Sequence, residues 1–188
     1  MDPKIKRLIK KVKKGDQAAF SELVNLYKNQ VYNICYRMVG LPQEAEDLAQ
    51  ETFLRAYTNI ERYETNRKFS TWLYRIATNL SIDYLRKKKP SDYLDAEIPG
   101  TNGFNMYMHI ASCERLPEEH LLENEMQETI QYEISQLPPK YRSVIVLKYL
   151  QDLSLKEISE ILDIPETTVK TRVHRGREAL RKRLRHFF

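Results

Sequence analysis

The chain has 188 residues, of which 41% are hydrophobic and 30% charged, with five glycines and eight prolines, a composition that excludes a low-complexity or largely disordered protein. This length suits one medium domain or two small ones. The longest unbroken aliphatic run, Val144 to Leu147, is far shorter than the roughly 20 apolar residues of a membrane span, so we expect no membrane insertion. No apolar stretch follows the N-terminal lysines, and the two cysteines, Cys35 and Cys113, are too few for a disulfide framework. Both observations predict a reducing, cytoplasmic location.

The net charge of +5 is distributed unevenly along the chain. Residues 1–91 carry a net charge of +8, residues 92–133 carry −9 and residues 134–188 carry +6. Two basic ends around an acidic middle suit a polyanion that is held at two places. A solvated surface of uneven charge accounts for the same numbers equally well.

Apolar residues recur at helical spacing through most of the first 90 residues. Small polar caps and glycine stops mark where the helices begin and end. The predicted helices run from the cap Asp2 and Pro3 to a stop at Gly15, from the cap Asp16 to Gly40, from Pro42 to Ile60, and from a cap at Ser70 or Thr71 to the basic run before Pro90. Residues 62–69 lack periodicity and are predicted to form a loop. The four helices make the first predicted domain, residues 1–90.

Periodicity disappears over residues 91–120, which we predict to be an acidic linker. It resumes near Leu122, stops at Pro138-Pro139 and continues over residues 141–150. Ser154 and Glu157 then form a capping box before a short helix, residues 155–162. A turn at residues 163–165 leads into a last helix that ends near Leu184. The sequence therefore predicts an all-α protein of two small helical domains, the second over residues 121–188.

Residues 155–177 have the layout of a helix-turn-helix, in which the second helix is rich in polar and basic groups. Its Val169 and Val173 are predicted to be buried. The side chains left for phosphates and base edges are Thr167, Thr168, Lys170, Thr171, Arg172, His174 and Arg175. From Lys170 onward there are eight basic residues and one acidic residue, which favours DNA binding over a basic surface helix that closes a bundle.

The fourth helix of the first domain carries a second stripe off its expected buried face: Trp72, Arg75, Asn79, Asp83 and Arg86. Aromatic side chains beside a basic loop are what single-stranded bases stack on. Trp72, Tyr74 and the loop with Arg67, Lys68 and Phe69 could therefore hold unpaired nucleotides. For Trp72, packing under the loop is an equally good interpretation.

Asp47, Gln50 and Glu51 share one face of the third helix and form either a partner-binding patch or an ordinary solvated face. A zinc site at His109, Cys113 and His120 is disfavoured, because the spacing matches no common zinc pattern. No phosphate loop, nucleophile elbow or other catalytic signature occurs. We therefore expect no enzyme activity, no cofactor and no metal.

Three segments together resemble the extracytoplasmic-function (ECF) sigma factors of bacterial RNA polymerase, and among them the sigma-W type. They are EAEDLAQE over residues 44–51, FSTWLYRIATN over residues 69–79, and residues 165–180. The resemblance spans both predicted domains. It implies a module for the promoter −10 element first and a module for the −35 element last, with an alternative sigma factor as the function.

The resemblance also implies residue roles and partners. Asp47, Gln50 and Glu51 would face the clamp helices of the largest polymerase subunit, and the flap would be a second contact. Arg75, Asn79 and Asp83 would read the −10 element, and the loop of residues 62–69 would hold a flipped base. Lys170, Thr171, His174 and Arg175 would contact the −35 element. A membrane-anchored anti-sigma factor released under envelope stress is also expected.

One position departs from the family, which usually has Gly and then Thr after the turn, where this chain has Thr167 and Thr168. A side chain at Thr167 could limit how closely the helix approaches the phosphates. Two rival functions compete with this interpretation, and we expect neither. One is an autonomous helix-turn-helix regulator that dimerises on a palindrome, and the other is a zinc enzyme built on the His109 cluster.

Overall fold

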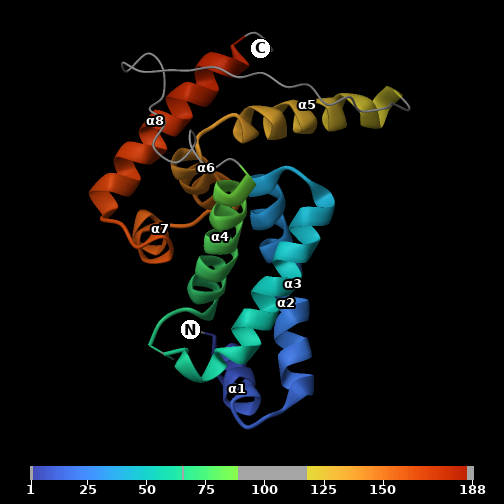
Figure 1. Ribbon diagram of the computed structural model, residues 1–188, viewed down its shortest axis with the longest axis vertical. Coiled ribbons are helices and arrows are strands. Elements are labelled where there is room, and N and C mark those ends of the chain that lie inside the picture. Colours follow the sequence, from blue (N-terminus) through green and yellow to red (C-terminus); the bar gives the residue numbers. More distant parts are fainter. Residues whose placement is uncertain (1, 65, 89–117, 186–188) are drawn as a thin grey trace.

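The computed structural model describes residues 2–64, 66–88 and 118–185, with the backbone alone over residues 118–125. All regular structure in these residues is helical (Figure 1), which confirms the predicted all-α class. The elements are α1 (Pro3–Val12), α2 (Gln17–Val39), α3 (Pro42–Thr58), the 3-10 turn η1 (Ile60–Arg62), α4 (Phe69–Lys88), α5 (Glu118–Ser135), α6 (Pro139–Ile145), the π-helical turn η2 (Val146–Leu150), α7 (Leu155–Leu162) and α8 (Glu166–Leu184).

The helix ends follow from local hydrogen bonds of the capping residues. The Asp2 carboxylate accepts the backbone N–H of Lys4 at 2.8 Å, and the Asp16 carboxylate accepts that of Ala19 at 3.0 Å. Gly40 ends α2 in the left-handed conformation, with φ at 77°, which a glycine adopts without steric cost. These predicted ends are confirmed. The predicted cap of α4 is wrong, because Phe69 begins the helix and Ser70 and Thr71 lie inside its first turn.

In the first four helices, α2 packs against α1, α3 and α4. The centre of this group consists of fully buried side chains from α2 and α4, including Ile34, Met38, Leu73 and Ala77. Cys35 is also fully buried there, and desolvation raises the pKa of its thiol to about 11. The thiol is therefore a packing group of this core.

The C-terminal helices form the predicted helix-turn-helix, with α7 and α8 joined by a short turn. The Ser154 hydroxyl accepts the backbone N–H of Glu157, and the Glu157 carboxylate accepts the backbone N–H of Ser154, which confirms the capping box. Asp163 ends α7 in the left-handed conformation. Helix α8 packs on α6 so closely that a Cβ at Gly176 would lie 2.8 Å from Cγ1 of Ile145.

The two helical groups pack against each other, with α7 beside α4 (Figure 1). Buried residues of η2, α7 and α8 belong to the same apolar core as those of α2 and α4. Arg142, whose side chain is buried, connects the groups, because its guanidinium donates to the carbonyl of Met38 on α2 and to those of Ser135, the last residue of α5, and Leu137 just after it. Helix α5 begins at Glu118, three residues inside the range expected for the linker. None of the described helices combines the length and the apolar composition that a membrane crossing needs.

Candidate nucleic-acid interface

The first half of α8 presents the side chains that the sequence singled out. Val169 is fully buried and Val173 half-buried, so these two residues fix the helix on its neighbours. The exposed side chains on the opposite face are Thr167, Lys170, Thr171, His174 and Arg175, while Thr168 and Arg172 are half-buried. Seven polar or basic side chains thus surround one exposed helix face, as major-groove recognition requires.

A surface cleft of about 360 Å³ lies beside this face. Its walls are five of the expected residues, Thr167, Thr168, Thr171, Arg172 and Arg175, together with Lys140 and Tyr141 at the start of α6. Lys170 and His174 do not line it. The sequence prediction missed Lys140 because it lies outside the helix-turn-helix. The sequence feature that could have drawn attention to Lys140 is its position directly after Pro138-Pro139, where one helix stops and the next begins.

The threonine that replaces the family's glycine occupies an ordinary helical position. Among the described residues, positive φ angles occur at Asp152, Asp163, Gly15 and Gly40, so Thr167 is not one of them. A glycine is not required there by the backbone. The exposed Thr167 side chain adds one hydroxyl to the rim of the cleft.

On α4, two of the aromatic residues proposed for base stacking are buried in the core. Phe69 is 2% exposed and Tyr74 is 6% exposed, and burial raises the pKa of Tyr74 to about 12. Phe69 packs against Tyr27 and Tyr63, with ring centroids 5.5 Å and 5.4 Å apart. Their expected role as exposed stacking surfaces is therefore wrong for this conformation, because α4 is covered on more than one face.

Trp72 packs under the loop before α4, which is one of the two interpretations that the sequence left open. It is half-buried, and its ring lies 5.2 Å from that of Tyr63 and 5.7 Å from that of Phe69. The Tyr63 hydroxyl donates to the carbonyl of Arg67 and so fixes the loop over these rings. Trp72 therefore packs under the loop while one part of it stays accessible.

The polar residues of the α4 stripe remain at the surface. Asn79 is exposed and Arg75 and Asp83 are half-buried. The Asp83 carboxylate binds the guanidinium of Arg86 at 2.9 Å. Arg67 and Lys68 are exposed in the loop before α4. These side chains lie on one flank of α4, together with a second cleft of about 400 Å³ that both Arg67 and Arg75 line.

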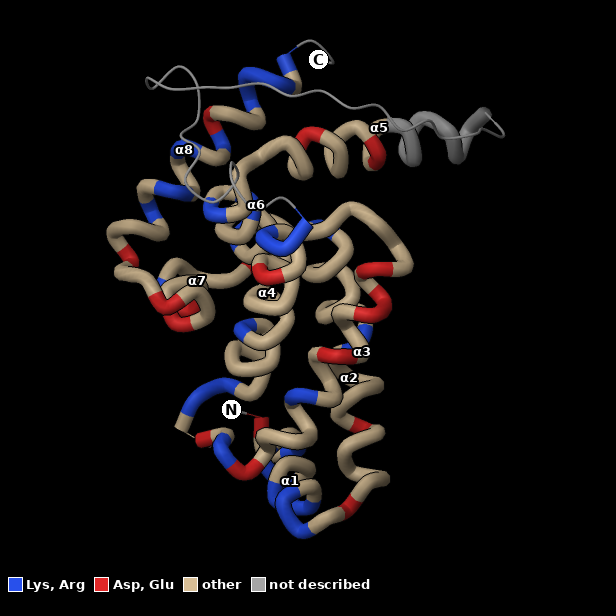
Figure 2. Tube along the Cα trace, viewed as in Figure 1, with Lys and Arg blue, Asp and Glu red and all other residues tan. Residues whose placement is uncertain are grey.

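Two cations of this flank are paired with carboxylates of the helix-turn-helix. Lys68 Nζ lies 2.7 Å from Oε1 of Glu157, and Arg75 Nη2 lies 3.1 Å from Oδ2 of Asp163. The ammonium of Lys68 and the capping bonds of Ser154 hold the pKa of Glu157 down at about 2. Figure 2 shows the acidic residues of α7 facing the basic start of α4.

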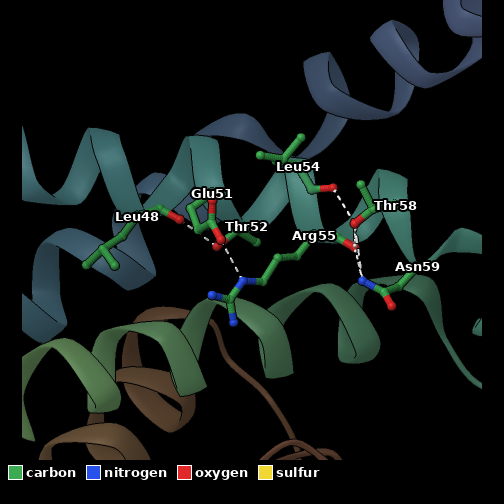
Figure 3. Close-up of polar contacts among 7 residues, drawn as sticks. All are labelled: Leu48, Glu51, Thr52, Leu54, Arg55, Thr58 and Asn59. Carbon is green, nitrogen blue, oxygen red and sulfur yellow. Dashed lines mark hydrogen bonds and ion pairs between the residues drawn. The ribbon is translucent and has the colours of Figure 1, made fainter.

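The third expected patch lies on α3, where Asp47 and Gln50 are exposed and Glu51 is half-buried. Arg55 donates to Glu51 at 2.7 Å along the same helix (Figure 3). Leu54, which the sequence prediction did not include, follows on this face and is 58% exposed. The sequence feature that could have added Leu54 to the patch is its helical spacing from Gln50 and Glu51. A single exposed leucine is common on protein surfaces, so Leu54 alone does not identify a protein contact.

The disfavoured zinc cluster is not tested, because His109, Cys113 and the side chain of His120 lie outside the described residues. Within the part of the chain that the structure describes, no three histidine, cysteine or acidic side chains gather as metal ligands.

The sequence matches two protein families, one in each helical group. Residues 23–90 match Sigma-70 region 2, and residues 127–180 match Sigma-70, region 4. Two solved structures share the fold. CnrH in complex with the cytosolic domain of CnrY has a TM-score of 0.70 at 20% identity, over 96% of this chain and 97% of that one. RpoE of Bartonella quintana in complex with the anti-sigma factor NepR has a TM-score of 0.63 at 19% identity, over 87% and 94%.

Relatives of established function match nearly the whole chain. The ECF RNA polymerase sigma factor SigW of Bacillus subtilis is 61% identical over 185 residues, which are 98% of this chain and 99% of the relative. The ECF RNA polymerase sigma-E factor of Escherichia coli is 35% identical, over 92% of this chain and 90% of the relative. The resemblance drawn from the sequence is confirmed. The chain belongs to the ECF sigma factors of RNA polymerase.

Proposed function

We propose that the chain directs core RNA polymerase to promoters by holding the −10 element on the exposed flank of α4 and the −35 element on α8. The observation that carries this proposal is the joint exposure of two recognition surfaces, one on each sigma region. On α8, hydroxyl, guanidinium and ammonium groups converge on a cleft at the helix start. On α4, an exposed amide and a guanidinium lie beside a basic loop.

The proposed residue roles follow exposure. The −10 surface is Arg67, Lys68, Trp72, Arg75, Asn79 and Asp83, without the buried Phe69 and Tyr74. The −35 surface is Thr167, Thr168, Lys170, Thr171, Arg172, His174 and Arg175. The buried aromatics support the −10 surface from below, because their rings hold Trp72 and the loop in place.

The polymerase contact is assigned to the α3 patch. Asp47, Gln50 and Glu51 would face the clamp helices of the largest subunit, and Leu54 would supply the apolar centre of the contact. The second helical group would bind the flap. The boundaries 1–90, 91–120 and 121–188 remain our proposal for the two modules and the acidic linker.

An anti-sigma factor is the proposed regulator. The RpoE structure with which this chain shares its fold contains the anti-sigma factor NepR, and the CnrH structure contains the cytosolic domain of CnrY. By analogy, this chain would act in the cytoplasm and be held by a membrane-anchored anti-sigma factor under non-stress conditions. The family is not a class of enzymes, and we propose no catalytic role for this chain.

Promoter opening tests the −10 surface directly. A 2-aminopurine in the −10 element becomes fluorescent when the holoenzyme unstacks it. Asn79→Ala should reduce this signal at equal holoenzyme concentration, while Asn25→Ala, which also removes an exposed amide, from α2, should leave it unchanged. Equal signals from both variants would remove Asn79 from the −10 surface. No signal from the wild-type holoenzyme would contradict the function itself.

A further inference from the structure

We infer that Lys140, on α6, is a further phosphate ligand of the −35 site. This inference rests on the proposed function of the α8 cleft and extends the site beyond the helix-turn-helix. Lys140 and Tyr141 form the wall of the cleft opposite Thr167, Thr171 and Arg175. A DNA strand that enters the cleft to reach α8 would therefore pass the Lys140 ammonium.

The ammonium of Lys140 is held near an aromatic ring and forms no ion pair with a described carboxylate. It lies 5.5 Å from the ring centroid of Tyr141, and that ring is buried, with 3% of the residue exposed. Among the described residues, no carboxylate forms an ion pair with Lys140. A lysine placed in this way has its donors available for a phosphate oxygen.

The chemistry of this group predicts its contribution. An ammonium on a flexible stem acts as a point charge, so it adds affinity on any sequence and reads no base. Removing one phosphate contact lowers the slope of log Kobs against log salt by about 0.9 for duplex DNA. This slope separates a phosphate contact from a folding defect, because a folding defect lowers the fraction of active protein and leaves the slope unchanged.

The test is a salt titration of promoter binding by the holoenzyme, followed by the fluorescence anisotropy of a labelled promoter duplex. Lys140→Ala should lower the slope by about 0.9. The matched control is Lys182→Ala, which removes an exposed lysine from the last turn of α8, outside the cleft. A slope for Lys140→Ala equal to that of Lys182→Ala overturns the inference alone. Failure of the wild-type holoenzyme to bind overturns the proposed function and this inference with it.

A second, independent observation concerns the ion pairs between α7 and α4. Glu157 and Asp163 bind two of the three cations of the proposed −10 surface, Lys68 and Arg75, and the carbonyl of Glu160 accepts a further bond from Arg75 at 3.4 Å. We propose that the acidic edge of α7 takes the place of the DNA backbone and covers this surface until the two modules separate. Carboxylates and phosphates compete for the same cations, since both are anionic acceptors.

Geometry requires that this contact opens. A DNA backbone bound at the proposed −10 surface would need the charges of Lys68 and Arg75, which Glu157 and Asp163 occupy in this arrangement. Helix α7 is part of the −35 module, yet it packs directly on α4 of the −10 module. A chain in this arrangement cannot occupy both elements at once. Simultaneous recognition therefore needs α7 to leave α4, and this movement exposes Lys68 and Arg75.

The variant Glu157→Gln with Asp163→Asn removes both charges and keeps the local structure. Glutamine serves in a capping box, and asparagine tolerates the left-handed position that ends α7. The matched control is Asp152→Asn with Glu178→Gln, which also removes two acidic groups. Asp152 has a positive φ as well, and neither Asp152 nor Glu178 forms an ion pair with α4.

The assay measures binding of a single-stranded −10 oligonucleotide to the free full-length chain and to the holoenzyme. In the free chain, the Glu157 and Asp163 variant should bind more tightly than the control, by a factor of about 2 to 30 for two exposed ion pairs. In the holoenzyme, both variants should bind equally. Equal affinities in the free chain would overturn the proposal. A wild-type holoenzyme that ignores the oligonucleotide would overturn the proposed −10 surface as well.

Discussion

Replacing Arg142 by leucine should cost a large part of the stability of the fold. Its guanidinium is buried, with 3% of the residue exposed. It donates to carbonyl groups at three backbone positions: Met38 near the end of α2, Ser135 at the end of α5 and Leu137 just after α5. The carbonyls at helix C-termini carry partial negative charge, which stabilises the buried cation. Leucine fills much of the volume but leaves these acceptors without a donor.

Each buried acceptor that loses its partner costs about 1–3 kcal/mol. The three costs do not simply add, because one side chain serves all three carbonyls and water can reach some of them after relaxation. We therefore expect a total loss of about 3–5 kcal/mol. This is a large share of the 5–15 kcal/mol that stabilises a typical domain. Arg142→Lys should lose less stability, because an ammonium keeps the positive charge near these carbonyls. Some loss remains, since an ammonium cannot reach carbonyls of two separate segments at once.

Urea unfolding followed by circular dichroism at 222 nm measures this loss. The control is Arg62→Leu, the same change at an exposed position of η1, which should shift the free energy of unfolding by less than about 0.5 kcal/mol. A shift for Arg142→Leu as small as that of Arg62→Leu would refute the argument that this guanidinium joins the two helical groups.

Three further predictions concern single groups. Gly176→Ala should destabilise the chain by about 1 kcal/mol, because a clash with the buried Ile145 exceeds the gain in helix propensity; a rise in the urea midpoint would contradict the close packing. The pKa of Glu157 is depressed to about 2, so its ion pair and cap stabilise fully above about pH 5 and lose that effect as the pH falls. The difference in urea midpoint between wild type and Glu157→Gln should therefore shrink between pH 7 and pH 3, and a constant difference would exclude the ion pair. Burial raises the pKa of the Cys35 thiol to about 11. In a Cys113→Ser background, Cys35 should therefore react with a disulfide reagent orders of magnitude more slowly than free cysteine, and equally fast labelling would show an open core.

The helix ends and the helix-turn-helix could be predicted because their causes are local. Asp16, Gly40 and the Ser154 capping box act on residues within four positions along the chain. The Sigma-70 regions were recognisable for a related reason, since each motif is contiguous in the sequence. The start of α4 was missed by two or three residues, because Phe69 enters the helix to reach the core between Tyr27 and Tyr63.

What the sequence could not predict depends on contacts between distant segments. A single stripe predicted for α4 leaves Tyr74 exposed, but the helix is covered by α2 and α3 on one side and by α7 on another, so Tyr74 is buried. Lys68 and Glu157 are 89 positions apart, and no periodicity indicates their pairing. The position of Lys140 in the wall of the cleft was also unpredictable from the sequence, since only the packing of α6 on α8 brings it there.

Run-off transcription with core polymerase tests the central claim most directly. The template carries −10 and −35 elements of the ECF type, and the wild-type chain is compared with Asn79→Ala. We predict initiation that needs both core and the chain and that weakens with Asn79→Ala. Tight binding of duplex DNA by a dimer without core, together with no initiation, would contradict the account and indicate an autonomous helix-turn-helix regulator instead.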